Sequence, residues 1–165
     1  MLSISAMAAS WFLPLVLPIC LYVCYTDMRE LRITNAANIA LLMVFVVVGL
    51  MVLPLDAYLW RYTHLAVALV VGMALNAGGV MGAGDAKFIA AAAPFVHLAD
   101  LRFLMALLAA SLIGAFVTHR LIKFSPLRRL APDWKSWTSG KRFPMGMALS
   151  AALTAYLIFG YRYGS

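Results

Sequence analysis

The chain has 165 residues, of which 65% are hydrophobic and 12% are charged, and its formal net charge is +7. Its mean hydropathy of +0.93 lies far outside the range of soluble globular proteins and is typical of a membrane-embedded bundle. This composition argues against a nucleic-acid-binding protein, which would carry its basic residues and aromatic platforms on a soluble face.

Six apolar segments follow one another along the chain. A spanning helix needs roughly 20 mostly apolar residues, and continuous apolar runs without alternation favour helices over a barrel. We therefore expect an all-α, polytopic membrane helix bundle of about six transmembrane helices, forming one membrane-embedded domain over residues 1–165. The expected spans are 7–25, 36–53, 63–81, 86–98, 101–121 and 145–161.

The first and fourth segments differ from ordinary spans, the first in lying at the amino terminus and the fourth in its short length. No lysine or arginine precedes Arg29, so the first segment lacks the basic start of a secretory signal and is expected to be a retained span. It holds the only two cysteines, Cys20 and Cys24, which are too few ligands for a metal site, and we expect neither metal nor cofactor. The fourth segment reaches only about 20 Å, so it starts earlier, tilts, or enters the bilayer without crossing.

Lysines and arginines are distributed unequally between the two sides of this six-span arrangement. One side has only Arg61, Arg102 and Arg162. By the positive-inside rule the richer side is cytoplasmic, which puts both termini outside and a basic loop at about 122–144 inside. The richer side carries Arg29, Arg32, Lys87, Arg120, Lys123, Arg128, Arg129, Lys135, Lys141 and Arg142.

Two aspartates, Asp27 and Asp85, lie at the predicted cytoplasmic ends of separate spans. An ionisable side chain near hydrocarbon costs about 2.5–3.5 kcal/mol on insertion scales, so it is a functional candidate that needs a partner. The run Gly82-Ala83-Gly84-Asp85 matches neither a phosphate-binding loop nor a dinucleotide fingerprint. Taken alone, it indicates a turn with Asp85 as the N-cap of the fourth span. The glycines at 82 and 84 would also let backbone and substrate approach closely.

Two facing carboxyl groups can hydrolyse a peptide bond without a nucleophilic side chain. At about 5 Å and an effective dielectric near 20, two full charges repel by roughly 3 kcal/mol, so one group keeps a proton. The ionised carboxylate can take a proton from an attacking water while the protonated carboxyl hydrogen-bonds the scissile carbonyl. Asp27 and Asp85 are therefore candidates for an acid-base pair.

Three sequence elements occur in order between the expected spans, and together they resemble the type IV prepilin peptidase family. The likeness extends over almost the whole chain and is greatest to the short, TadV/CpaA-like form. Thr34 stands where that family often has proline, and the Cys-x-x-Cys domain of the long, methylating members is absent from the sequence. The elements are Asp27 with Arg29, Ile33 and Asn35, then Gly82, Gly84, Asp85 and Lys87, then Pro144, Met145 and Gly146.

The resemblance implies a multi-pass aspartic endopeptidase of the bacterial inner membrane, with its active site facing the cytoplasm. It would remove the basic leader from type IV, Flp-type, prepilins or pseudopilins, and pilus or secretion assembly components are further partners to consider. Asp27 and Asp85 would be the catalytic pair. Methylation of the new amino terminus is not expected. The residues that would shape the site are Asn35, Gly82, Gly84, Lys87, Pro144 and Gly146.

Two other classes of function stay open at this point. A small proton-coupled transporter or channel subunit would use Asp27 and Asp85 as a relay, with the acids spread along a water path across the bilayer. A protease would hold both acids at one depth beside room for an extended peptide. A non-catalytic assembly scaffold would use Asp85 as a helix cap and Asp27 as a solvated loop end.

Overall fold

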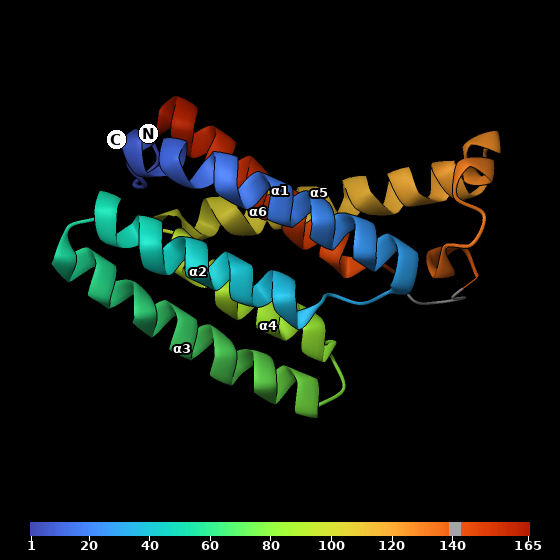
Figure 1. The fold of residues 1–165 in the computed structure, drawn as a ribbon, viewed down its shortest axis with the longest axis horizontal. Coiled ribbons are helices and arrows are strands. Elements are labelled where there is room, and N and C mark those ends of the chain that lie inside the picture. The colour runs from blue at the N-terminus through green and yellow to red at the C-terminus, as the bar shows by residue number, and fades with distance from the viewer. Residues whose placement is uncertain (139–142) are drawn as a thin grey trace.

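The computed structural model describes residues 1–138 and 143–165, which contain six α-helices and no strand (Figure 1). The expectation of an all-α bundle is confirmed. Lys141 and Arg142, which belong to the expected basic loop, lie outside the described residues. Short 3-10 turns occupy 93–95, 98–100, 126–130 and 135–137. The helices are α1 (Ala6–Glu30), α2 (Asn35–Val52), α3 (Leu55–Ala77), α4 (Ala83–Ala92), α5 (Leu101–Lys123) and α6 (Met145–Tyr163).

Four stretches among the described residues are long and apolar enough to cross a membrane: α1, α2, α3 and residues 98–123. Only 6% of the apolar window in 98–123 is buried inside the protein, so α5 presents most of its apolar surface outward. Such surface is stable in hydrocarbon and costly in water. The chain is therefore a helical membrane protein.

Two helices differ from the expected spans. Helix α3 begins at Leu55 rather than at residue 63, and it includes the buried Arg61, whose Nη1 atom donates a 3.1 Å hydrogen bond to the Pro94 carbonyl. This bond lets a charged residue lie inside the fold, which hydropathy alone does not anticipate. Helix α4 has ten residues, about 15 Å, and is too short to cross a core of about 30 Å by itself.

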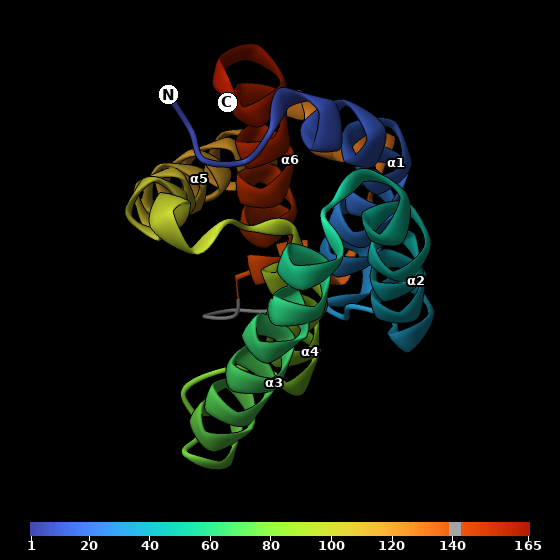
Figure 2. The ribbon, with the colours of Figure 1, turned by 90° about the vertical axis from the view of Figure 1, so that its left-hand side faces the viewer.

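The core lies where α1, α2, α4 and α6 meet. Helix α1 packs on α6 and α2, α4 packs on α3, and α5 packs on α6, as the end-on view shows (Figure 2). Aromatic rings fill the centre: the Phe95 ring lies edge-on to Phe12 at 4.8 Å and to Phe45 at 5.5 Å between centroids. Gly72 of α3 lets α4 approach closely, because a Cβ there would lie 3.0 Å from the Cβ of Ala86.

The two ends of the bundle are built differently. At one end the termini lie side by side, where Ser165 N–H donates to the Leu2 carbonyl at 3.0 Å (Figure 1). A buried carboxylate, Asp100, holds this end together by accepting hydrogen bonds from Ser3 N–H at 2.8 Å and from the Tyr156 hydroxyl at 2.8 Å. At the opposite end lie the connections after α1, α3 and α5, which carry the residues of interest.

Candidate active site

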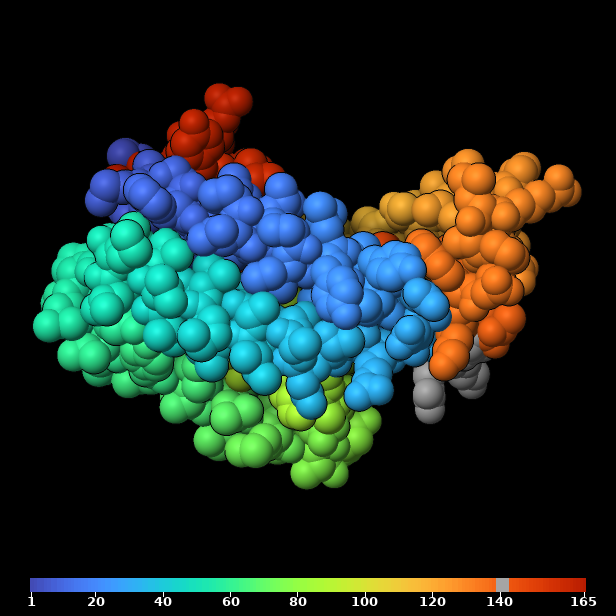
Figure 3. Space-filling view, viewed as in Figure 1, coloured from blue at the N-terminus to red at the C-terminus, as the bar shows by residue number. Residues whose placement is uncertain are grey.

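A cavity of about 720 Å³ opens at the end of the bundle opposite the termini. Its walls come from the last turn of α1, the start of α2, the connection between α3 and α4, and the starts of α4 and α6. Figure 3 shows the end of α1 beside the α3–α4 connection on the molecular surface. The volume lies within the range of ligand-binding clefts. Of the residues singled out in the sequence, Asp27, Asn35, Gly82, Gly84, Asp85 and Lys87 line it.

Asp27 occupies the last turn of α1 and is only 5% exposed. Its Oδ2 atom accepts a hydrogen bond of 2.6 Å from the backbone N–H of Gly146, in the first turn of α6. Helix starts have unpaired N–H groups, so the Asp27 carboxyl satisfies one of them across the bundle. A side chain at Gly146 has no room, because its Cβ would lie 2.9 Å from that same oxygen. Met145 lines the cavity and Pro144, the N-cap of α6, is buried beside it.

Asp85 lies in the first turn of α4 and is half-buried. The N-cap of α4 is Gly82, so the expectation that Asp85 is the N-cap is wrong. Burial raises the pKa of the Asp85 carboxyl above its ordinary value, and a hydrogen bond from the Gly82 backbone partly opposes that rise. A Cβ at Gly82 would lie 2.8 Å from the Asp85 Oδ2 atom, which gives the first glycine of the motif a steric reason.

Asn35 and Lys87 meet across the cavity. The Lys87 ammonium donates a 3.0 Å hydrogen bond to the Asn35 Oδ1 atom, and both side chains are exposed. This bond joins the first turn of α2 to the start of α4, two residues after Asp85. Thr34, at the position where the resembling family often has proline, caps α2 by accepting a hydrogen bond from the Ala37 N–H at 3.2 Å. The departure from the family pattern therefore keeps the start of α2 in place.

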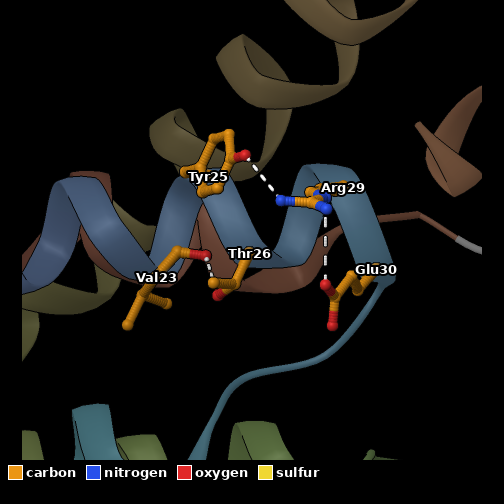
Figure 4. A network of polar contacts seen from close by, with 5 residues as sticks. All are labelled: Val23, Tyr25, Thr26, Arg29 and Glu30. Carbon is orange, nitrogen blue, oxygen red and sulfur yellow. Dashed lines mark hydrogen bonds and ion pairs between the residues drawn. The ribbon is translucent and has the colours of Figure 1, made fainter. Parts of the chain in front are cut away.

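The end of α1 also carries polar contacts on its outer surface (Figure 4). Arg29 donates a 2.9 Å hydrogen bond to the Tyr25 hydroxyl and lies 3.9 Å from a Glu30 carboxylate oxygen. Exposed ion pairs of this kind contribute roughly 0–1 kcal/mol. Leu31, in the left-handed conformation with φ of 53°, then ends the helix and enters the cavity wall. Tyr25, Arg29 and Glu30 lie on the outer surface of α1 and do not line the cavity.

One part of the cavity wall was missed by the sequence analysis. Residues 79–81 in the α3–α4 connection line it, and Asn76 holds them by donating a 2.8 Å hydrogen bond to the Met81 carbonyl. In the sequence, the pair Gly78-Gly79 directly after an apolar run indicates a turn at this place. In the structure, Gly79 has a φ of 71°, which favours glycine. Among the described residues, no group of three or more His, Cys, Asp or Glu side chains is placed to hold a metal ion.

The chain matches one known protein family over most of its length. The model of the type IV leader peptidase family matches residues 14–119, which is more than half of the chain and includes Asp27 and Asp85. Searches of the curated proteins and of the solved structures each found no match. Both aspartates of the matched region line one cavity. On the strength of this match, the chain belongs to the type IV leader peptidase family.

Proposed function

We propose that the chain is a membrane aspartic endopeptidase that cleaves the basic leader from type IV, Flp-type, prepilins or pseudopilins, with Asp27 and Asp85 as the catalytic pair. One observation carries the proposal: the two aspartates, 58 positions apart in the sequence, line a single cavity at one end of the bundle. The family match supports a protease, and the cavity supplies a place for its substrate.

The chemistry follows from placing two carboxyl groups at one cavity. Because both groups cannot ionise freely at close range, the pair holds one proton over a range of pH, and its apparent pKa values belong to the pair. The ionised member takes a proton from a water molecule as the water attacks the scissile carbonyl carbon. The protonated member stabilises the carbonyl oxygen and then supplies the proton that the departing amine needs.

The position of the cavity suits a substrate that enters from lipid. A prepilin leader precedes an apolar helix, so the bond to be cut lies where the substrate helix leaves the bilayer. Asp27 lies in the last turn of α1 and Asp85 in the first turn of α4, and both line one cavity at the end of the bundle opposite the termini. This placement favours a protease over a proton relay, whose acids would be spread across the membrane.

We further propose that this end of the bundle faces the bacterial cytoplasm, with both termini outside. The described residues at this end include Arg32 and Lys87 at the cavity, Lys123 at the end of α5, and Arg128 and Arg129 after it. By the positive-inside rule, this concentration of basic residues marks the cytoplasmic side. A basic leader would be retained on that side for the same reason.

The proposal is tested by co-expressing the chain with a Flp-type prepilin and following leader removal by gel shift. Asp27→Asn and Asp85→Asn are each expected to abolish cleavage while the protein stays in the membrane fraction. Asp56→Asn, which changes an exposed aspartate in the first turn of α3, is the matched control and should cleave normally. Normal processing by either dyad variant would overturn the proposed mechanism.

A further inference from the structure

A second cleft, of about 520 Å³, lies just beyond the end of α5. It shares no lining residue with the cavity that holds Asp27 and Asp85. Residues of the segment 123–132 form it, and this segment projects from the end of α5 (Figure 3). The cleft is therefore a separate feature of the molecular surface.

Three cations line this cleft: Lys123, Arg128 and Arg129. Within the described residues, none of the three forms an ion pair, and the ion pair that is present joins Arg29 to Glu30. Asp133 is the single acid of the segment 122–138 and does not line the cleft. The positive charge is thus not neutralised by the protein, and an anion in the cleft would meet several donors at once.

Large apolar side chains surround these cations. Phe124 is 78% exposed, Leu127 56% and Leu130 83%, and all three directly follow the outward-facing apolar surface of α5. In water such a patch would be unfavourable, whereas at a membrane surface it lies level with the start of the acyl chains. A phosphate beside hydrocarbon is the chemistry of a phospholipid rather than of a soluble anion.

We propose that this cleft binds the phosphate of an anionic phospholipid. Lys123, Arg128 and Arg129 contact the phosphodiester oxygens, and Phe124, Leu127 and Leu130 contact the acyl chains below it. An anionic lipid is preferred over a zwitterionic one, because its headgroup adds no positive charge among the three cations. The inference stands without the proposed catalytic function, since its measurement is lipid binding and not cleavage.

Native mass spectrometry of the full chain in an uncharged detergent tests the proposal, with phosphatidylglycerol or phosphatidylcholine added. We expect retained phosphatidylglycerol in excess of phosphatidylcholine, and binding about thirtyfold weaker for the Arg128→Gln/Arg129→Gln variant, since each basic residue contributes roughly fivefold. Arg102→Gln/Arg162→Gln removes two exposed arginines from the opposite end of the bundle and is the matched control. Its lipid binding should equal that of the parent chain.

Two further measurements distinguish a bound phospholipid from loss of fold and from a site for free phosphate. The Arg128→Lys/Arg129→Lys variant keeps both charges and should retain most of the binding, which separates loss of charge from loss of fold. Millimolar inorganic phosphate should leave the bound lipid in place. Equal retention of the two lipids, unchanged binding by the glutamine variant, or full displacement by inorganic phosphate would each overturn the proposal.

Discussion

The backbone N–H of Gly146 donates a 2.6 Å hydrogen bond to the Asp27 carboxylate, although the two residues are 119 positions apart in the chain. The start of α6 and the end of α1 are thereby fixed to each other beside the cavity. A glycine is required at the donor position because any Cβ would occupy the space that the carboxylate needs. The Pro144-Met145-Gly146 element therefore fixes the position of the Asp27 carboxylate.

Gly146→Ala is expected to reduce leader cleavage by about a hundredfold or more. The new Cβ would lie 2.9 Å from the Asp27 Oδ2 atom and 3.0 Å from its Cγ, so the carboxyl must shift. A displacement of about 1 Å can cost a catalytic group roughly a hundredfold in rate. The measurement is the rate of leader removal by equal amounts of membrane-inserted protein.

The matched control for that substitution is Gly114→Ala in α5, where the structure shows open space around the position of the new Cβ. Both changes add one methyl group to a helix. Cleavage by the control should equal that of the parent chain. If Gly146→Ala also cleaves normally, the carboxyl position set by α6 does not matter to the reaction.

Asn35→Ala and Lys87→Met are expected to impair cleavage to a similar extent, and the double variant should be no worse than either single one. The two side chains form one hydrogen bond, so removing either partner removes the whole interaction. Because both are exposed, thermal stability should change by less than about 1 kcal/mol. Additive losses in the double variant would show that Lys87 acts independently of Asn35.

Asp85→Asn is expected to raise the melting temperature, and the gain should grow with pH. Burial raises the pKa of the Asp85 carboxyl, so its ionised form destabilises the folded state. That cost is absent below the ordinary aspartate pKa of about 3.9 and increases as the pH rises through the raised value. Thermal melts in detergent between acid and neutral pH test this, with Asp56→Asn as an exposed control. A gain that does not change with pH would contradict the explanation.

Much of the fold follows from hydropathy alone. The apolar segments around Phe12, Phe45 and Tyr156 all become helices, because lipid leaves the backbone no other way to pair its polar groups. The start of α3 was misplaced because Arg61 interrupts an apolar pattern that resumes only after it. Its hydrogen-bond partner, the Pro94 carbonyl, comes from a segment 33 positions away and cannot be inferred from local sequence.

The sequence predicts which residues belong to the candidate site but not which of them contact one another. Sequence order places Asp27 and Asp85 on the same side of the membrane, at the end of one span and before the start of another, and both line one cavity. The partners of Asn35 and Gly146 depend instead on how α2, α4 and α6 pack, which a linear pattern does not contain. The N-cap prediction for Asp85 is wrong for a local reason: α4 starts at Ala83, three residues before the expected start at residue 86, so its N-cap is Gly82.

Trp134→Ala is expected to expose the basic segment after α5 to trypsin about five- to tenfold faster. The Trp134 ring lies edge-on to Tyr25 at 6.0 Å and stacks on Trp137 at 5.8 Å, which ties the segment to α1 two residues before Asp27. Such aromatic pairs contribute roughly 0.5–1.5 kcal/mol, and cleavage by a protease follows the population of the opened form. Trp134→Phe should keep most of the protection, and Trp11→Ala, an exposed tryptophan elsewhere on α1, should leave it unchanged. Equal digestion of all variants would show that the segment is held by other contacts.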